Sequence, residues 1–226
     1  MNILAIECTH AALSAAVMHA GVVTELRSAE WKKAAETLVP LVAELLEASR
    51  LERQQLDSIA ISAGPGSFTS LRIGMSVAKG MAYGLGKPLV PVPTLPAMAA
   101  ALPAKDEADS VLAVIGARKG EYYFATYTPH DLAAGVWHSE VHRGDGRDVV
   151  AAATSAWGRT VVVGRQLGEL APALAESGAI YREADFFSAR SLLAAAERLF
   201  SSADSLELDA VTPDYRQMFT PNSGRG

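Results

Sequence analysis

The glycine-rich segment Gly64-Pro65-Gly66-Ser67 has residue types that proteins use to bind anions. Its two glycines can adopt backbone conformations that other residues resist, and the proline fixes the chain between them. A helix that starts here could hold a phosphate on its free N–H groups, but the phosphate-binding P-loop needs a lysine after its last glycine, and none is present. We therefore favour a structural and interface role, with Ser67 or Thr69 capping the helix, over phosphate binding.

A second chemical candidate is the carboxylate and thiol pair Glu7 and Cys8 at the end of the first apolar run. A phosphate-binding hairpin after this run would need glycines, because β-carbons keep backbone N–H groups away from a phosphate, and residues 8–12 contain none. ATP hydrolysis by this chain alone is therefore not expected. We interpret Glu7 as a strand-end carboxylate bonded to nearby backbone, and Cys8 as a buried core thiol.

His138 and His142 have a spacing that would allow metal binding on a helix. Residues 136–141 alternate as a strand does, however, and four residues of a strand span roughly 13 Å, too far for two nitrogens about 2 Å from one ion. The sequence also lacks the HExxH motif of zinc proteases and the GxSxG motif of serine hydrolases. We therefore predict no metal, no cofactor, no catalytic residue and no protease activity.

Composition places these candidates in a globular protein. The chain has 226 residues, 50% of them hydrophobic, and a formal net charge of −5 with a pI near 5.6. That charge argues against tight, unaided nucleic-acid binding, because Lys and Arg contacts to phosphates supply most of the non-specific affinity. One cysteine, no apolar run of about 18 residues and no signal-like N-terminus predict a soluble cytoplasmic protein.

Hydrophobic periodicity predicts the elements of the first half. Apolar runs predict strands at residues 3–8, 13–18, 21–27, 57–62 and 87–92, and helical spacing predicts helices at 35–49, 68–85 and 94–102. Pro40 removes a backbone donor, so the helix at 35–49 should begin near it or bend there.

The second half repeats this order of strands followed by helices and strands, after a polar, proline-bearing stretch at residues 103–109. We predict strands at 111–115, 122–127 and 136–141, followed by segments at 149–156, 160–163, 167–175 and 188–200 that alternate helix and strand. Two similar α/β lobes, residues 1–104 and 105–226, are therefore predicted, with 220–226 disordered.

The predicted helix at 68–85 is apolar on nearly all sides, so it must pack on its own sheet and on something else. Its small residues Gly74, Ala78, Gly80 and Gly84 would let another helix approach closely. The residues alone leave open the alternative that this chain's own fold covers the helix completely.

Residues 64–74 read GPGSFTSLRIG, which resembles the GPGSFTGLRIG signature of the TsaB (YeaZ) family with one departure, at Ser70. Residues 3–9 resemble the family's ILAIDTS opening, 93–95 its post-strand turn, 117–122 its DARRGEVY segment (with Gly116 in place of the aspartate) and 213–216 its PxYLR segment. The resemblance spans nearly the whole chain.

The resemblance implies an actin-like ATPase (ASKHA) fold: two ribonuclease-H-like lobes, each a mixed sheet flanked by helices. It implies a non-catalytic cytoplasmic subunit, required for threonylcarbamoyladenosine formation on tRNA. Such a subunit pairs with the catalytic paralogue TsaD, which binds the metal, meets the ATPase TsaE through that complex, contacts tRNA indirectly and forms a homodimer when alone. The rival of another class is an autonomous ATPase or small-molecule kinase, against which the glycine-free hairpin argues.

Family members pair through two helices of the first lobe in a four-helix arrangement. Carried over to this chain, the resemblance implies the following partner-binding residues: Leu38, Val42, Leu45, Thr69, Arg72, Ile73, Ser76, Val77, Gly80 and Met81. Arg118, Lys119 and Arg216 are basic positions that could face tRNA or the partner, although a solvated charge is favoured for Lys119.

Overall fold

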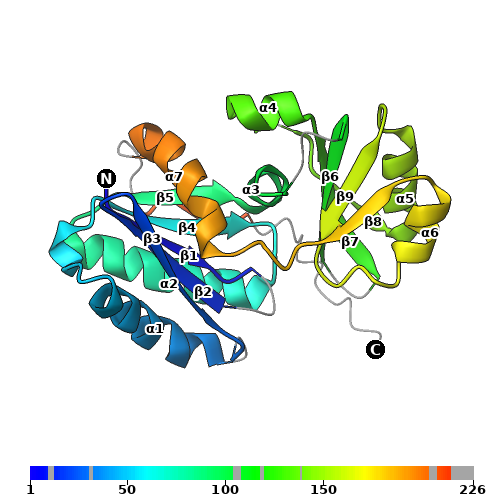
Figure 1. Cartoon of the computed structure of the whole chain (residues 1–226). Helices are drawn as coiled ribbons and strands as arrows, with labels where there is room; N and C mark the ends of the chain where they lie inside the picture. The colour runs from blue at the N-terminus through cyan, green and yellow to red at the C-terminus, as the bar shows by residue number, and fades with distance from the viewer. Residues whose placement is uncertain are drawn as a thin grey trace, which may run out of the picture.

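Two five-stranded sheets form the framework of the chain (Figure 1). The computed structural model describes residues 1–9, 13–30, 33–103, 108–117, 120–137, 139–203 and 208–214. The strands of the first sheet are β1 (Ile3–Glu7), β2 (Leu13–His19), β3 (Val22–Ser28), β4 (Ser58–Gly64) and β5 (Leu89–Pro93). Those of the second are β6 (Ser110–Gly116), β7 (Glu121–Tyr127), β8 (His142–Asp145), β9 (Thr160–Gly164) and β10 (Ile180–Glu183).

The two sheets have the same topology. The first runs β3-β2-β1-β4-β5 and the second β8-β7-β6-β9-β10. In both, the first three strands form an antiparallel meander, the fourth pairs in parallel with the first, and the fifth pairs in parallel with the fourth. The predicted repetition of one α/β pattern is therefore present in strand order and direction, although the sequence shows no matching repeat.

Strand β1 lies at the centre of the first sheet and is buried on both faces. Ile3 and Ala5 belong to one apolar cluster, while Leu4 and Ile6 belong to another on the opposite face, as the two-residue period of a strand requires. This explains why residues 3–6 form a continuous apolar run without alternation.

Different helices cover the two faces of the first sheet (Figure 1). Helices α1 (Ala34–Ala48) and α2 (Phe68–Leu85) pack on the Leu4 face, and the short 3-10 helix η2 (Arg53–Gln55), which has no buried residue, lies between them in the chain. Helices α3 (Thr94–Ala100) and α7 (Ala189–Ala203) pack on the Ile3 face. Helix α1 begins at Ala34 and runs through Pro40, which excludes a start close to the proline, and the alternative of a bend at Pro40 stays a prediction.

The two sheets share one apolar core. The cluster on the Ile3 face also contains Val111, Ala113 and Val163 from the second sheet, and α3 packs between the two. The opposite face of the second sheet is covered by α5 (Gly146–Ser155) and α6 (Ala171–Glu176). The sheets are therefore joined through packed side chains and not only through the chain connection.

Helix α7 follows the second sheet in the chain but lies across the first (Figure 1). The division into residues 1–104 and 105–226 stays a prediction, and by its packing α7 belongs with the N-terminal sheet.

The segment after β7 differs from its sequence-based prediction. Residues 136–141 do not form the expected strand in the part that the structure describes, and helix α4 (Pro129–Ala134) precedes them. Thr128 caps α4 by accepting a hydrogen bond from the Asp131 N–H, Pro129 occupies its first turn, and Gly135 ends it in a left-handed conformation. These capping signals were present in the sequence, and the alternation after them was misleading.

Because residues 136–141 do not form a strand, the strand spacing between His138 and His142 no longer counts against a metal site there. His142 begins β8, and His138 lies outside the described residues. Among the described residues, no group of three or more His, Cys, Asp or Glu side chains is arranged to hold a metal ion.

Candidate functional site

The turn between β4 and α2 is closed by the protein's own residues. Gly64 has a φ of +109°, and its N–H donates to Thr94 Oγ1 at 3.0 Å. A β-carbon at Gly64 would lie 2.7 Å from the Asp214 carbonyl oxygen, and the Asp214 N–H donates to the Ala63 carbonyl at 2.7 Å. The chain near its C-terminal end thus packs directly on this turn, and glycine is needed for the approach.

The other side of the turn packs on the end of β1. A β-carbon at Gly66 would lie 2.7 Å from Thr9 Cβ, and the Ser67 N–H donates to the Thr9 carbonyl at 3.1 Å. Ser67 occupies the N-cap position of α2 without capping it: its Oγ accepts from Ser70 Oγ at 3.1 Å. The expected side-chain cap is therefore not formed by Ser67.

Glu7 and Cys8 have the surroundings expected from the sequence. The buried Glu7 carboxylate accepts a hydrogen bond from the Thr9 N–H at 2.8 Å and another from the Thr9 hydroxyl. Cys8 is 2% exposed, and its Sγ donates to the Ser70 carbonyl at 3.3 Å. Burial, with a smaller contribution from the Glu7 charge, raises the pKa of the Cys8 thiol well above its ordinary value, so this thiol stays protonated and unreactive.

Three of the predicted partner-binding residues do not face solvent. Leu38, Val42 and Leu45 lie on the inner side of α1, and each is at most 3% exposed within the chain's own core. The 3.6-residue period correctly identified the apolar stripe of α1, but that stripe packs on the sheet and on α2. In this conformation these side chains have no surface to offer a partner.

The predicted positions on α2 form its outward face. Thr69, Arg72, Ser76 and Gly80 are exposed, while Ile73, Val77 and Met81 are partly buried between this face and the core. The inward stripe of the same helix consists of fully buried residues: Leu71, Met75, Ala78 and Ala82. The helix is therefore buried on one side only by this chain.

Large apolar side chains that were not among the predicted residues are exposed on α1 and α2. Phe68 is 39% exposed, Tyr83 82% and Val39 on α1 55%. The Arg72 guanidinium lies 4.9 Å from the centroid of the Phe68 ring, which holds both side chains at the start of α2. The same 3.6-residue period would have placed Val39 outside the buried stripe of α1.

Glycines on this face leave room for close approach. A β-carbon at Gly80 or Gly84 would meet no atom within 4 Å, so no contact inside the chain requires glycine there. A small, partly apolar surface with Phe68 and Tyr83 toward its two ends is suited to packing against another helix. Arg118, Lys119 and Arg216, the candidate basic positions, lie outside the described residues.

The paired sheets of like topology, their flanking helices and the turn after β4 define a two-lobed α/β protein of the actin-like ATPase fold, as predicted. Residues 10–149 match the family model for TsaD, tRNA N6-adenosine threonylcarbamoyltransferase, and the chain belongs to this family. The match includes α1, α2 and the turn that precedes α2.

Curated relatives with similar sequences carry the name tRNA threonylcarbamoyladenosine biosynthesis protein TsaB, which agrees with the resemblance seen in the motifs. The Escherichia coli protein is 36% identical over 140 residues, 62% of this chain and 60% of the relative. The Haemophilus influenzae protein is 34% identical over 125 residues, 55% of this chain and 53% of the relative. The chain thus spans between about half and three-fifths of the length of these relatives.

Solved structures agree with the fold. YeaZ from Pseudomonas aeruginosa superposes with a TM-score of 0.77 at 23% identity, covering 95% of this chain and 99% of that one. In the described residues, no helix is both long and apolar enough to span a membrane.

Proposed function

We propose that this chain is a non-catalytic cytoplasmic subunit in the formation of threonylcarbamoyladenosine on tRNA. In this proposal it pairs with TsaD, the catalytic member of its family, meets the ATPase TsaE through that complex and contacts tRNA only indirectly. The pairing surface is the outward face of α2 (Thr69, Arg72, Ile73, Ser76, Val77, Gly80 and Met81).

The observation that carries the proposal is the one-sided burial of α2. Its inner stripe is in the core, while its outer face exposes aromatic and aliphatic side chains beside two glycines with open space. Exposed apolar area of this kind marks interaction sites, and glycines at i and i+4 allow helix backbones to approach closely. The Escherichia coli relative named TsaB matches 62% of this chain, and a relative named tRNA N6-adenosine threonylcarbamoyltransferase matches 33% of it, which supports a partner of related fold.

The proposal that this chain catalyses no reaction is supported by the turn before α2, whose backbone N–H groups are occupied by contacts within the chain. Phosphate binding at a helix start requires free backbone N–H groups. Here the N–H groups of Gly64 and Ser67 already donate to Thr94 and Thr9, and Gly66 packs on the Thr9 side chain. A nucleotide phosphate would have to displace these contacts.

Light scattering of this chain alone and mixed with TsaD from the same organism tests the proposal. We expect a monomer or homodimer of this chain to be replaced by a one-to-one heterodimer. Masses that never combine would overturn the pairing. Calorimetric titration of the isolated chain with ATP tests the second part: tight binding, with micromolar affinity, would favour an autonomous ATPase or kinase instead.

A further inference from the structure

A groove between α3, α4 and α7 has the lining of a binding site for a small organic anion. Its volume is about 420 Å³, within the range of small-molecule sites. Apolar side chains form most of the lining, and two arginines are among the lining residues: Ala97, Ala100, Ala101, Leu132, Ala133, Trp137, Arg190, Ser191, Ala194, Ala195 and Arg198. None of these described lining residues carries a carboxylate.

The two arginines lie on one face of α7. Arg190, Ala194 and Arg198 are spaced four residues apart, so they align along the helix, with the arginine backbones about 12 Å from each other at ~1.5 Å per residue. All three are exposed, and the central alanine leaves the space between the arginines open. The groove therefore has a positive group toward each end and a small side chain in the middle.

Contacts within the chain hold both guanidinium groups in place without neutralising them. Arg190 Nη2 donates to the Val23 carbonyl at 3.0 Å, and Arg198 Nη1 donates to the Ala133 carbonyl at 3.2 Å. Neither guanidinium forms an ion pair with a carboxylate among the described residues. Each guanidinium has five N–H donors, so several stay available to a carboxylate or phosphate.

Trp137 adds an aromatic wall to the groove. Its indole packs against the shared core, and its Nε1–H is buried with no acceptor among the described residues. Buried donors of this kind are rare in proteins, because leaving one unpaired is costly. Because the N–H itself is covered, Trp137 contributes the face of its ring to the groove, and its N–H signal reports on a ligand packed against that ring.

From these observations we propose that the groove between α3, α4 and α7 binds a small organic anion. The ligand has an apolar body that packs on Trp137 and the alanines, and carboxylate or phosphate groups that bind Arg190 and Arg198. The site is independent of the proposed pairing surface, because α7 and α3 cover the face of the first sheet opposite α1 and α2.

Nuclear magnetic resonance of the full chain tests this site directly, with the indole N–H signal of Trp137 assigned by Trp137→Phe. The probes are terephthalate and phenyl phosphate, which separate carboxylate from phosphate recognition, and the neutral analogue benzenedimethanol. We expect at least one anion to shift the signal saturably and the neutral analogue to have no such effect. No saturable shift with either anion, or an equal effect of the neutral analogue, would overturn the proposal.

Two variants locate the binding. Arg198→Ala and Arg190→Ala should each weaken anion binding about tenfold or more, since each removes charge-assisted hydrogen bonds. The control Arg53→Ala, a surface arginine on η2, should bind as the unmodified chain does. Unchanged affinity in both groove variants would contradict the site. If Arg190→Ala fails to fold, the exposed Arg198 carries the test alone, with Arg198→Glu as its charge reversal.

Discussion

The carboxylate of Glu25 on β3 accepts a hydrogen bond from the backbone N–H of Arg190 at the start of α7, at 3.0 Å. The two residues are 165 positions apart in the chain. Glu25 also forms an ion pair with Arg27 at 2.9 Å, and only 9% of its side chain is exposed. This one carboxylate therefore attaches the beginning of α7, with its macrodipole and unpaired N–H groups, to the edge of the first sheet.

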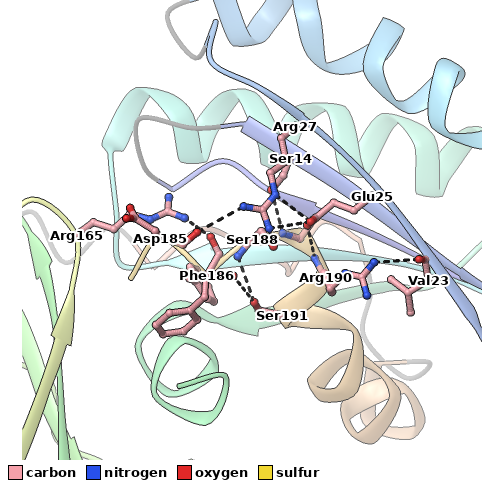
Figure 2. Close-up of polar contacts among 12 residues, drawn as sticks. Ser14, Val23, Glu25, Arg27, Arg165, Asp185, Phe186, Ser188, Arg190 and Ser191 are labelled. Atoms are coloured by element: carbon pink, nitrogen blue, oxygen red, sulfur yellow. Dashed lines mark hydrogen bonds and ion pairs between the residues drawn. The ribbon is translucent and has the colours of Figure 1, made fainter. Parts of the chain in front are cut away.

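Other polar contacts reinforce this attachment (Figure 2). The Ala189 N–H donates to Ser14 Oγ at 2.9 Å, and Arg27 Nη2 donates to Ser188 Oγ at 3.0 Å. On the side of the second sheet, Arg165 Nε donates to the Ala184 carbonyl at 3.0 Å. The segment that leads from β10 to α7 is thus fixed at both ends, which explains how the last helix of the chain packs on the first sheet.

Replacing Glu25 with glutamine should destabilise the protein in a pH-dependent way. Burial acts to raise the pKa of Glu25, but hydrogen bonds from Ser188, from the Arg190 backbone and from Arg27 outweigh it and lower the pKa below its ordinary value of 4.5. The charged form therefore contributes stability above that value and loses it as the pH falls through the folded-state pKa. At neutral pH we expect Glu25→Gln to cost about 1–2 kcal/mol in urea unfolding.

The pH series supplies the control for this prediction. The difference between Glu25→Gln and the unmodified chain should shrink as the pH is lowered below 4.5. Glu176→Gln, at an exposed position on α6, should show no comparable difference at any pH. A loss of stability in Glu25→Gln that is the same at all pH values would mean that shape, and not charge, is what matters at this position.

Alanine at Gly74 and at Gly80, two glycines of α2, should change stability in opposite directions. A β-carbon at Gly74 would lie 2.2 Å from Cys8 Sγ, whereas at Gly80 it would meet nothing within 4 Å. Gly74→Ala should cost about 1–3 kcal/mol through overpacking, and Gly80→Ala should gain up to about 1 kcal/mol through helix propensity. Urea unfolding measures both. Adding Cys8→Ala to Gly74→Ala should recover part of the loss, and no recovery would place the clash elsewhere.

Gly64→Ala should destabilise the protein more than Gly21→Ala, a change at a glycine that also has positive φ but has open space around it. Both Gly64 and Gly21 have positive φ, at +109° and +77°, yet only a β-carbon at Gly64 would approach another atom, the Asp214 carbonyl. Gly21→Ala should cost about 1 kcal/mol from backbone strain alone, and Gly64→Ala distinctly more. Hydrogen exchange of the Asp214 amide should accelerate in Gly64→Ala only. Equal behaviour of the two variants would show that the chain end does not constrain the turn.

The sequence was sufficient to predict the elements that have one strong period. Helix α2 was placed at its observed bounds, and the strands of the first sheet were found because each is a short apolar run. The second lobe was harder, since β8 and β10 are only four residues long and contain no buried residue, so neither carries a periodic signal. Helix α4 was missed because its evidence lay in capping residues and not in hydrophobic spacing.

The site could be predicted only in part, for a related reason. Periodicity shows that a helix has an apolar stripe, but it does not show which stripe faces the sheet when two faces are apolar. The partner-binding residues implied by the resemblance therefore included both the inner residues Leu38, Val42 and Leu45 and the outer residues of α2. Their burial in the structure distinguishes the two groups. Asp214 and Gly64 are 150 positions apart in the chain, so no local sequence pattern could predict that they are in contact.

The proposed pairing surface makes a prediction about residues that are only partly buried in this chain. Ile73→Glu and Met81→Glu should leave the fold intact and abolish binding to TsaD, because an unpaired carboxylate buried in an interface costs several kcal/mol. Light scattering detects the loss of the heterodimer, and circular dichroism reports folding. Trp157→Glu, at a 79% exposed aromatic in the second lobe, is the matched control and should pair normally. If the α2 variants unfold, Ser76→Glu at an exposed position of the same face repeats the test, and normal pairing of that variant would remove this face from the interface.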